Sequence, residues 1–459
     1  MPINDPHPEY EAMTSRWKRC RDVAAGSDAV KAAGTRYLPR PPGMDHFDGS
    51  YRAYLARTLF FNAMSRTIDG LAGAIFQKSP TVVVPKTVEP SLADISLSDE
   101  SLDGFALRVT REVLTTGRCA VLVDVASAET NNGPYMALYP AESLVSWRTG
   151  GRGGSSVLVR AVLHVVIDEP DAKDESKISR RDMYRELVLS DNVYRVRLWT
   201  SLPRLHVRDT SKEIWVSGDW MTPQRRGKPL SFIPLLIIGA NRLGAHVARP
   251  PLVDLADVNL SHYRSSADRE AALYFVSMPT PWVSGAKGDG PLKIGASVAW
   301  DLEKDGRAGM LEHSGQGIGA IKDAMQEKTA MMATLGARLL EEAPRVGETA
   351  TAVTMRHAGE HATLRTIAQT VEAGLSQALG WFAWWVGTEK TPADVGASIE
   401  LNKDFLNVRM SAEDMKALML MWQTDGISFE TLHYNLTQGE AMRPGVTADD
   451  ERRQIGREG

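Results

Sequence analysis

The sequence predicts an α+β fold that is mainly helical, on two observations. Three long segments repeat apolar residues at spacings of three and four, which is typical of helices: residues 251–276, residues 320–340 and a stretch that begins near Thr349. From about residue 101 to residue 240, a helical pattern is followed by short apolar or alternating runs that are typical of strands. A chain of 459 residues can bury a large core and form several domains.

The first half contains most of the predicted strands. Residues 9–26 and 51–76 are predicted to be helices separated by a Gly/Pro-rich connection, and a third helix runs through Phe105 to Thr115. The predicted strands then follow in the order CAVLVDV, VLVRAVLHVVID, YRELVLS, YRVRLWT, EIWV and PLLIIG. We therefore expect one α+β domain that ends near residue 240.

The second half is predicted to be built on long helices. At roughly 1.5 Å per residue, the helix over residues 251–276 would be about 39 Å long. A Gly- and Pro-rich insert over residues 277–319 follows, with the strand-like pieces PTPWVSG, ASVAWDL and AGMLEHSG. The helix over residues 320–340 ends at the break EEAPRVGE, and the longest helix then runs to about residue 388. The segment ASIELNKDF alternates like a strand, and residues 411–459 form a helical tail.

The composition excludes several classes of protein. The formal net charge of −4 and an isoelectric point near 6.2 argue against a broad basic surface that grips nucleic acid. The two cysteines, Cys20 and Cys119, lack metal-ligand spacing and support neither a disulfide framework nor a Cys-based zinc site. The start, MPINDPHPEY, does not match a signal peptide, and the longest apolar run, FIPLLIIGA, is about half a membrane span. We expect a protein of the reducing cytosol that is neither secreted nor membrane-spanning.

The stretch RHAGEH matches the H-x-x-E-H pattern of one class of zinc peptidases. His357 and His361 are one helical turn apart and could both bind one Zn²⁺, while Glu360 could activate the bound water. Zinc chemistry also needs a third ligand. Three later carboxylates are available, without distinctive spacing: Glu413, Glu430 and Glu440. We interpret the histidines as polar positions on an amphipathic helix, and we keep a zinc metallopeptidase as the alternative hypothesis.

Other motifs indicate no catalytic site. GANRLG has the glycine spacing of a phosphate-binding loop, but Ala245 and His246 stand where that motif requires Lys and Ser/Thr, so we predict a strand-to-loop turn. TGGRGGSS is interpreted as a flexible surface loop. Trp381, Trp384 and Trp385 have helical spacing, which favours a core or a subunit interface over base stacking. No nucleophile elbow or Ser/His/Asp set stands out, so we predict a protein that is not an enzyme and needs no cofactor or metal.

The order of elements and the wording of several stretches resemble the portal proteins of tailed bacteriophages. The order is a long helix, a Gly/Pro-rich insert, a helix, a short break and a very long helix. The similarity is to a portal group long catalogued as a domain of unknown function. The stretches that carry it are FFNAMSRTIDGLAGAIFQKSP, PPLVDLADVNLSHYRSSADREAALYFVSMPTPWVSG, MMATLGARLLEEAPRVGETATAVTMRHAGEHATLRTIAQTVEAGLSQAL and GISFETLHYNLTQGE. Residues 86–230 match by position more than by wording.

The resemblance implies a portal-like fold with named parts. A mixed α/β wing would carry long stem helices, an inserted clip and a helical C-terminal crown. In chain order the parts would be N-terminal helices and wing (1–250), first stem helix (251–276), clip (277–319), second stem helix (320–340), tunnel loop (341–349), long wing helix (350–388), wing strand (389–410) and crown (411–459).

The resemblance also implies a structural function in the virion. Portal proteins assemble in the host cytoplasm as a ring, usually of twelve copies, at one capsid vertex. The ring passes double-stranded DNA during packaging and ejection, and it contacts the terminase, the major capsid or scaffolding protein, and neck or adaptor proteins. An acidic loop would let DNA slide, because each phosphate that Lys or Arg neutralises adds affinity. A capsid-associated adaptor of a different fold is a third hypothesis.

Two sets of residues follow from this assignment. The predicted tunnel loop in the DNA channel comprises Glu341, Glu342, Pro344, Arg345, Gly347 and Glu348. The predicted clip residues for terminase or neck docking are Trp282, Lys287, Lys293 and Trp300.

Overall fold

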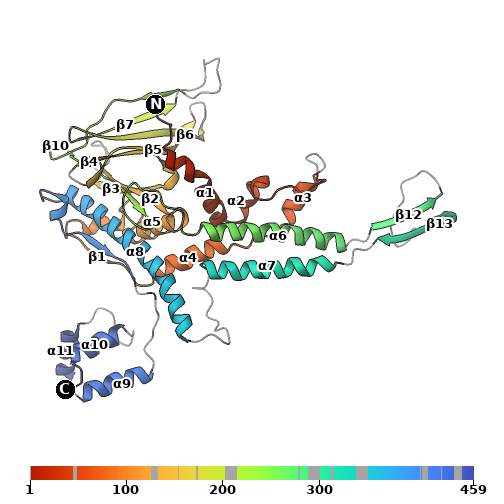
Figure 1. Ribbon diagram of the computed structural model, residues 1–459. Coiled ribbons are helices and arrows are strands. Elements are labelled where there is room, and N and C mark those ends of the chain that lie inside the picture. Colours follow the sequence, from red (N-terminus) through yellow and green to blue (C-terminus); the bar gives the residue numbers. More distant parts are fainter. Residues whose placement is uncertain are drawn as a thin grey trace. The chain divides into compact units, whose positions relative to one another are not determined.

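The computed structural model divides into two compact units, Met1–Lys403 and Asp404–Gly459 (Figure 1). The residues that the structure describes are 2–44, 49–125, 133–152, 155–171, 174–201, 214–277, 280–287, 300–311, 315–336, 350–403, 405, 412–424, 426–438 and 447–458. The prediction of a mixed α and β fold is confirmed.

Helix α5 (Leu102–Thr116) begins and ends at recognisable capping residues. Ser101 accepts a hydrogen bond from the Gly104 N–H at the start of α5, and Gly117, with φ of +84°, ends that helix in the left-handed conformation. The α-helices of this unit are α1 (Pro8–Ala25), α2 (Ser27–Ala32), α3 (Ser50–Arg57), α4 (Ala63–Ile75), α5 (Leu102–Thr116), α6 (Val253–Ser277), α7 (Gln316–Leu335) and α8 (Ala350–Val386).

The strands of the larger unit pair antiparallel throughout the described residues. One sheet has the order β11 (Leu235–Gly239), β2 (Arg118–Val125), β3 (Pro134–Pro140). A larger sheet has the order β4 (Leu144–Arg152), β5 (Ser155–Asp171), β6 (Asp174–Ser190), β7 (Val193–Ser201), β8 (Trp215–Ser217). Three two-stranded pairs are β1 (Thr81–Val83) with β14 (Ser398–Glu400), β9 (Gln224–Arg225) with β10 (Lys228–Pro229), and β12 (Thr280–Ala286) with β13 (Leu302–Leu311).

One apolar core joins both larger sheets to α1. Trp17 of α1 is fully buried in it, and Leu122 of β2 packs there with residues of β5, β6 and β11. Helices α5 and α8 contact β2 as well, so this strand is buried over almost its full length, as its uninterrupted apolar sequence CAVLVDV requires. The core therefore fixes the sheets and the first part of the chain as one body.

The predicted helix over residues 51–76 is wrong, because the chain forms two helices there. Helix α3 ends at Arg57, and α4 begins after Asn62, whose side chain accepts a hydrogen bond from the Ser65 N–H as its N-cap. The extended stretch between them is held by a residue far away in sequence. Asn259 of α6 is fully buried, accepts from the Met64 N–H and donates to the Phe61 carbonyl. These tertiary hydrogen bonds replace those that a continuous helix would have made.

The prediction of a flexible loop at TGGRGGSS, residues 149–156, is also wrong for the described part. The first four residues belong to β4 and the last two to β5, and the ladder pairs Thr149 with Leu158 and Gly151 with Ser156. The sequence pattern predicted neither β3 nor β4. Glycines give a poor strand signal alone, but here the pairing partners of β5 supply the stability.

Several predicted boundaries shift in the second half. Helix α6 spans Val253–Ser277, close to the expected range, whereas α7 begins at Gln316 and therefore takes residues from the predicted insert. Helix α8 ends at Val386, and a short 3-10 helix, Pro392–Asp394, precedes a strand of three residues, Ser398–Glu400.

The aromatic end of α8 packs into the core, in agreement with one of the two predictions for its tryptophans. Trp384 is buried in the common core and Trp385 packs against it. Trp381 lies beside the Phe232 ring, with 5.1 Å between the ring centroids. The indole NH of Trp384 donates to the Lys390 carbonyl. This end of α8 is therefore fixed by contacts within the chain.

Gly374 permits the close contact between α8 and β11. A Cβ built on this residue would lie 2.7 Å from Cδ1 and Cγ1 of Ile238, closer than side chains approach one another.

We expect Gly374→Ala to destabilise the unit by about 1–3 kcal/mol through overpacking, measured by urea denaturation. The control is Gly73→Ala on α4, where a Cβ meets nothing within 4 Å and a gain of about 0.5–1 kcal/mol is expected. Equal effects of the two substitutions would contradict this account.

The smaller unit contains α9 (Ala412–Gln423), α10 (Phe429–Gln438) and α11 (Ala448–Glu458). Arg452 of α11 pairs with Glu430 of α10 at 2.6 Å and lies over the Phe429 ring, which holds the two helices together. In the described parts of both units, no helix is long and apolar enough to cross a membrane.

Candidate functional site

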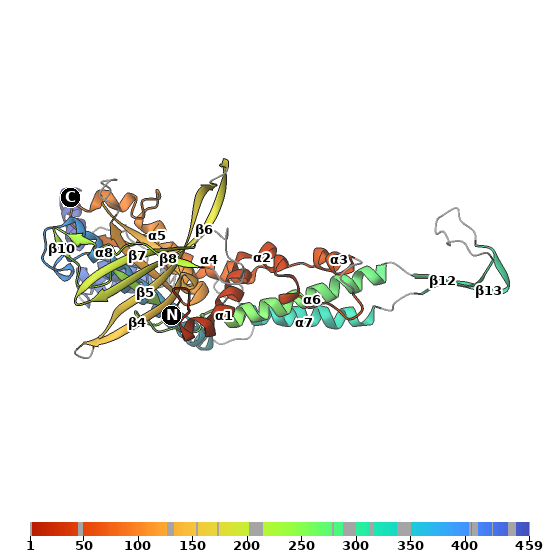
Figure 2. The ribbon, with the colours of Figure 1, turned by 90° about the horizontal axis from the view of Figure 1, so that it is seen from above.

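Helices α6 and α7 form an antiparallel pair. The β12–β13 hairpin is inserted between the last residue of α6 and the first residue of α7, at the far end of the pair (Figures 1 and 2). Three contacts fix the direction. Gly315, just before α7, lies near Val276 at the end of α6, and Lys328 Nζ bonds Ser265 Oγ at 2.5 Å. Gly336, after α7, lies near Leu252 at the start of α6. Since α6 has 25 residues, the pair extends about 37 Å at 1.5 Å per residue.

The first half of α6 is buried in the body of the unit. Its apolar side chains pack with α1, α3 and α4, and the buried residues include Leu255, Ala256, Leu260, Tyr263 and Ala267. The Tyr54 hydroxyl of α3 donates to the Asp268 carboxylate at 2.7 Å. The pair is thus anchored at one end by an ordinary protein core.

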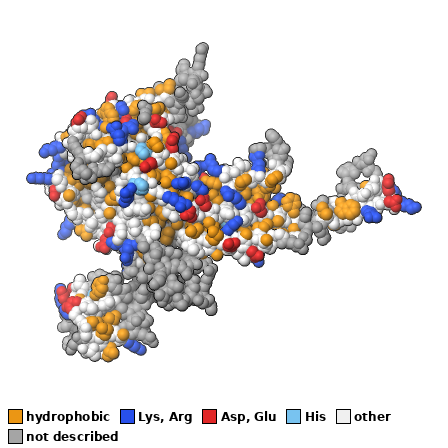
Figure 3. Space-filling view, viewed as in Figure 1, with side chains coloured by type: hydrophobic (Ala, Val, Ile, Leu, Met, Phe, Trp, Pro, Cys, Tyr) orange, Lys and Arg blue, Asp and Glu red, His pale blue; other side chains and the backbone are white. Residues whose placement is uncertain are grey.

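The second half of α6 and the outer face of α7 expose large apolar side chains (Figure 3). Phe275 is 57% exposed, and Leu273, Tyr274, Met331 and Leu335 are exposed to lesser degrees. A helix with apolar side chains on several faces is typical of one that is buried in an assembly. In a single copy these side chains stay partly exposed, although the Arg57 guanidinium lies 3.6 Å from the Tyr274 ring centroid, so they form a candidate interface.

The hairpin continues the exposed apolar surface. Trp282, Met310 and Leu311 are all about half exposed. Trp282 lies against Gly309, where an added Cβ would be 2.9 Å from Nε1 of the indole, so the ring lies flat across the partner strand. The flat contact explains why glycine occupies this position.

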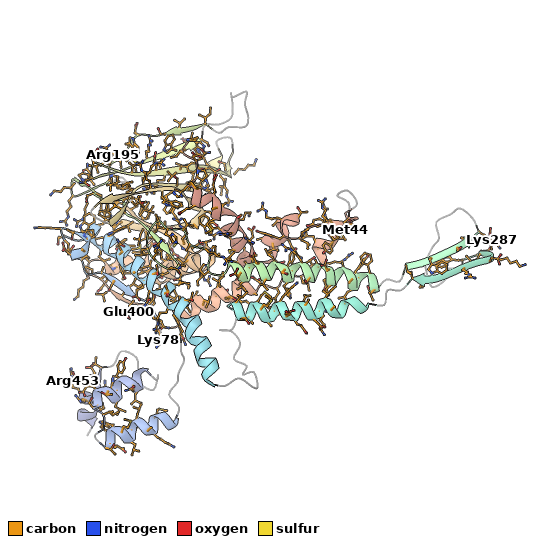
Figure 4. All side chains as sticks on the ribbon, in the orientation of Figure 1. Met44, Lys78, Arg195, Lys287, Glu400 and Arg453 are labelled. Atoms are coloured by element: carbon orange, nitrogen blue, oxygen red, sulfur yellow. The ribbon has the colours of Figure 1, made fainter. Side chains whose placement is uncertain are left out.

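Charge on the helix pair and hairpin is sparse and balanced. Helix α6 carries two arginines and four carboxylates, while α7 carries two lysines and two carboxylates. The described hairpin has three basic and three acidic side chains, among them the pair of Lys287 Nζ with Asp301 at 3.2 Å. Figure 4 shows Lys287 on the hairpin. A surface of this kind has no excess of cations to hold a polyanion.

The structure places three of the four predicted clip residues. Trp282 and Lys287 lie on or directly after β12, and Trp300 is half-buried just before β13. Lys293 lies outside the described residues. The same holds for the whole predicted tunnel loop, residues 341–349, which connects α7 to α8.

The H-x-x-E-H motif lies in the first turns of α8. His357, Glu360 and His361 are helical in the backbone, but their side chains lie outside the described part. The side chains that are described contain no group of three or more His, Cys, Asp or Glu that could hold a metal ion.

We expect chelator-free protein to contain no stoichiometric zinc by elemental analysis. Stoichiometric zinc that disappears in His357→Ala would instead support the peptidase hypothesis.

GANRLG forms a tight turn after β11. The Gly239 N–H donates to the Arg242 carbonyl at 3.1 Å, and the Gly244 N–H donates to the Ile237 carbonyl at 2.9 Å. A phosphate-binding loop leaves its backbone N–H groups free for the phosphate. Because two of them are used internally here, the strand-to-loop turn is the better description.

His262 is a buried titratable group on the helix pair. The residue is 8% exposed, and its Nδ1 has no hydrogen-bond partner among the described residues. Burial lowers the pKa of His262 below its usual value of 6.5, and Lys328 of α7 lowers it further. The unfolded chain therefore binds a proton more readily, so stability falls as the pH drops through about 6.5.

We expect His262→Leu to lose less stability than the parent between pH 7.5 and pH 5, measured by urea denaturation at both values. An unchanged difference would contradict this.

A family model described as a domain of unknown function (DUF4055) matches residues 251–386, from the start of the helix pair to the end of α8. A search of curated proteins finds no match.

Several solved structures match this chain over most of its length, at low identity and low TM-score. The neck of an empty GTA particle computed with C6 symmetry gives a TM-score of 0.39 at 14% identity, covering 90% of this chain and 98% of that one. The virion of a native gene transfer agent (GTA) particle gives 0.37 at 13% identity, with the same coverage. The neck of a native GTA particle computed with C12 symmetry gives 0.38 at 12%, covering 89% and 98%.

Proposed function

We propose that this chain is a portal-type subunit that assembles into a closed ring around an axial channel for double-stranded DNA. The ring would occupy one capsid vertex, and its role would be structural rather than enzymatic. The observation that carries the proposal is the antiparallel α6–α7 pair with its hairpin. The pair is anchored at one end, and towards the other end Phe275 of α6 and Trp282 of the hairpin are exposed.

The exposed apolar side chains suit contacts between identical neighbours. In a ring each copy presents two different faces to its two neighbours, and a long helix pair with an inserted hairpin offers such faces. Burying a Phe side chain is worth about 1.5–3 kcal/mol, and the ring repeats that gain at every interface.

The charge distribution suits a conduit. Helix α6 has more carboxylates than arginines, and α7 has equal numbers of basic and acidic side chains. The pair therefore has no excess cations to pair with phosphates, and DNA beside it would be bound weakly. The terminase, capsid or scaffolding protein and neck proteins are the expected partners of such a ring.

Electron microscopy of the purified full chain tests the proposal. We expect particles that show a ring with an axial hole, and light scattering at the same concentration should give a multiple of the 50.3 kDa chain mass. A strict monomer at high concentration, or a compact particle without a hole, would count against it.

A further inference from the structure

A groove on the larger unit lies away from the helix pair. It has a volume of about 1360 Å³ and is bounded by β11 and the turn after it, by β4 and β5, and by α8. Aromatic side chains line it on both sides: Trp147 of β4, and Phe232 with Trp381. The groove is large enough for several residues of an extended peptide.

The floor of the groove is the free edge of β11. The Val123 N–H donates to the Pro234 carbonyl, and in an antiparallel ladder the direction alternates, so Leu235 and Ile237 direct their N–H and C=O groups away from β2. The turn at Arg242 and Gly244 uses the Ile237 carbonyl and the Gly239 N–H.

Three backbone groups remain on this edge without a partner among the described residues. They are the N–H and C=O of Leu235 and the N–H of Ile237. Both residues are only 4% exposed, and buried backbone groups are normally paired. An unpaired edge strand that borders a groove is the geometry by which proteins add a strand from another chain.

The groove is also basic. Its charged and titratable lining consists of His7, Arg148, Arg242 and His246, against a single carboxylate, Glu9. Neither arginine forms an ion pair with a described residue.

A further cation lies behind the aromatic wall. The Arg118 guanidinium is 4.5 Å from the Trp147 ring, is 1% exposed, and none of its nitrogens has a hydrogen-bond partner among the described residues. The Trp147 ring also stacks on His7, with 4.1 Å between the ring centroids. Burial lowers the pKa of Arg118 to about 10, so it stays charged at neutral pH and adds to the positive potential.

We propose that the groove binds an extended, acidic and apolar segment of a different protein, which pairs through its backbone with β11. Alternate side chains of that segment would contact the aromatic walls, and its carboxylates would pair with Arg148 and Arg242. This proposal does not depend on ring assembly.

A second copy of the chain is a poorer occupant. Residues 89–103 are strongly acidic, with five carboxylates and no Lys or Arg. This stretch is already folded, however: the Ile95 N–H donates to the Glu100 carbonyl, and the Ile95 carbonyl accepts from the Met136 N–H. Ile95 itself is buried, so the segment is not available as a strand.

The test uses the full chain and a fluorescein-labelled probe peptide, Glu-Val-Asp-Val-Thr-Val amide. Two matched peptides serve as controls: one with lysines in place of the acids, and one N-methylated at alternate residues to block strand pairing. We expect the acidic peptide to bind at least about tenfold more tightly than either control, a difference of about 1.4 kcal/mol. Amide hydrogen exchange over residues 233–239 should slow only with the acidic peptide.

Charge reversal in the protein completes the test. We expect the double variant Arg148→Glu with Arg242→Glu to reverse the preference toward the lysine peptide. The control Arg195→Glu replaces an exposed side chain of β7 outside the groove and should behave as the parent (Figure 4). Equal binding of all three peptides, or no exchange protection, would overturn the proposal. So would a change in the assembled mass of the double variant without peptide binding, because the groove would then be a subunit contact.

Discussion

Phe275→Glu is expected to abolish ring assembly while leaving the subunit folded. The side chain is 57% exposed in a single copy and touches only Tyr274 among described aromatic residues, so its replacement costs the monomer little. In the proposed ring the same position is buried against a neighbour. A buried carboxylate without a partner is strongly unfavourable, and the cost recurs at every interface.

Light scattering and circular dichroism separate the two effects. The variant should have the 50.3 kDa mass of one chain and an unchanged spectrum. The matched control is Ile178→Glu on β6, which is 75% exposed but lies on the large sheet. A Phe275→Glu chain that still forms rings would remove the second half of α6 from the interface. Loss of assembly in both variants would show a general effect of added charge.

Asn259→Ala is expected to lower the free energy of unfolding strongly, because Asn259 is a fully buried amide. The side chain is fully buried, and it holds both the Phe61 carbonyl and the Met64 N–H between α3 and α4. The substitution leaves the buried Met64 N–H without a partner, while the Phe61 carbonyl keeps the Ala63 N–H as a donor. Losing the buried partner costs roughly 1–3 kcal/mol. The segment between α3 and α4 should become less ordered in this variant, because no other described side chain bonds the Phe61 carbonyl or the Met64 N–H.

The measurement should be made in the Phe275→Glu background, where a monomer allows a defined free energy of unfolding. Urea denaturation should show the loss as a lower midpoint with little change in slope. Gln377→Ala, an exposed amide on α8, is the control and should change the free energy by less than about 0.5 kcal/mol. If Asn259→Ala behaved like this control, the tertiary origin of the helix break would be wrong.

The elements that sequence predicted well are those whose signal is local. Apolar periodicity identified α6 and α8 within a few residues, and uninterrupted apolar runs identified β2 and β11. The helix break after Arg57 was missed because its cause is Asn259, almost two hundred positions away. Strand β4 was missed because its glycines are stabilised by pairing with β5.

The candidate sites divide in the same way. Trp282 and Lys287 could be selected from sequence because they stand in a Gly/Pro-rich insert between two helical patterns. The basic groove could not be found in this manner. Arg118 looks like an ordinary start of a strand, and its burial behind Trp147 arises only when β2 and β4 come together. The free edge of β11 likewise follows from the order of strands in the sheet, which periodicity does not contain.

The antiparallel contact of α6 with α7 makes the hairpin an exchangeable module. Val276 and Gly315 already lie close together, so the two points where the hairpin joins the helices are held in register by the helices themselves. The entropic free-energy cost of closing a loop grows only slowly with loop length, by about 0.6 kcal/mol per doubling. A longer, shorter or unrelated insert could therefore be grafted at these junctions with little penalty to the body. The sequence of this tip could therefore diverge without any change in the core that supports it.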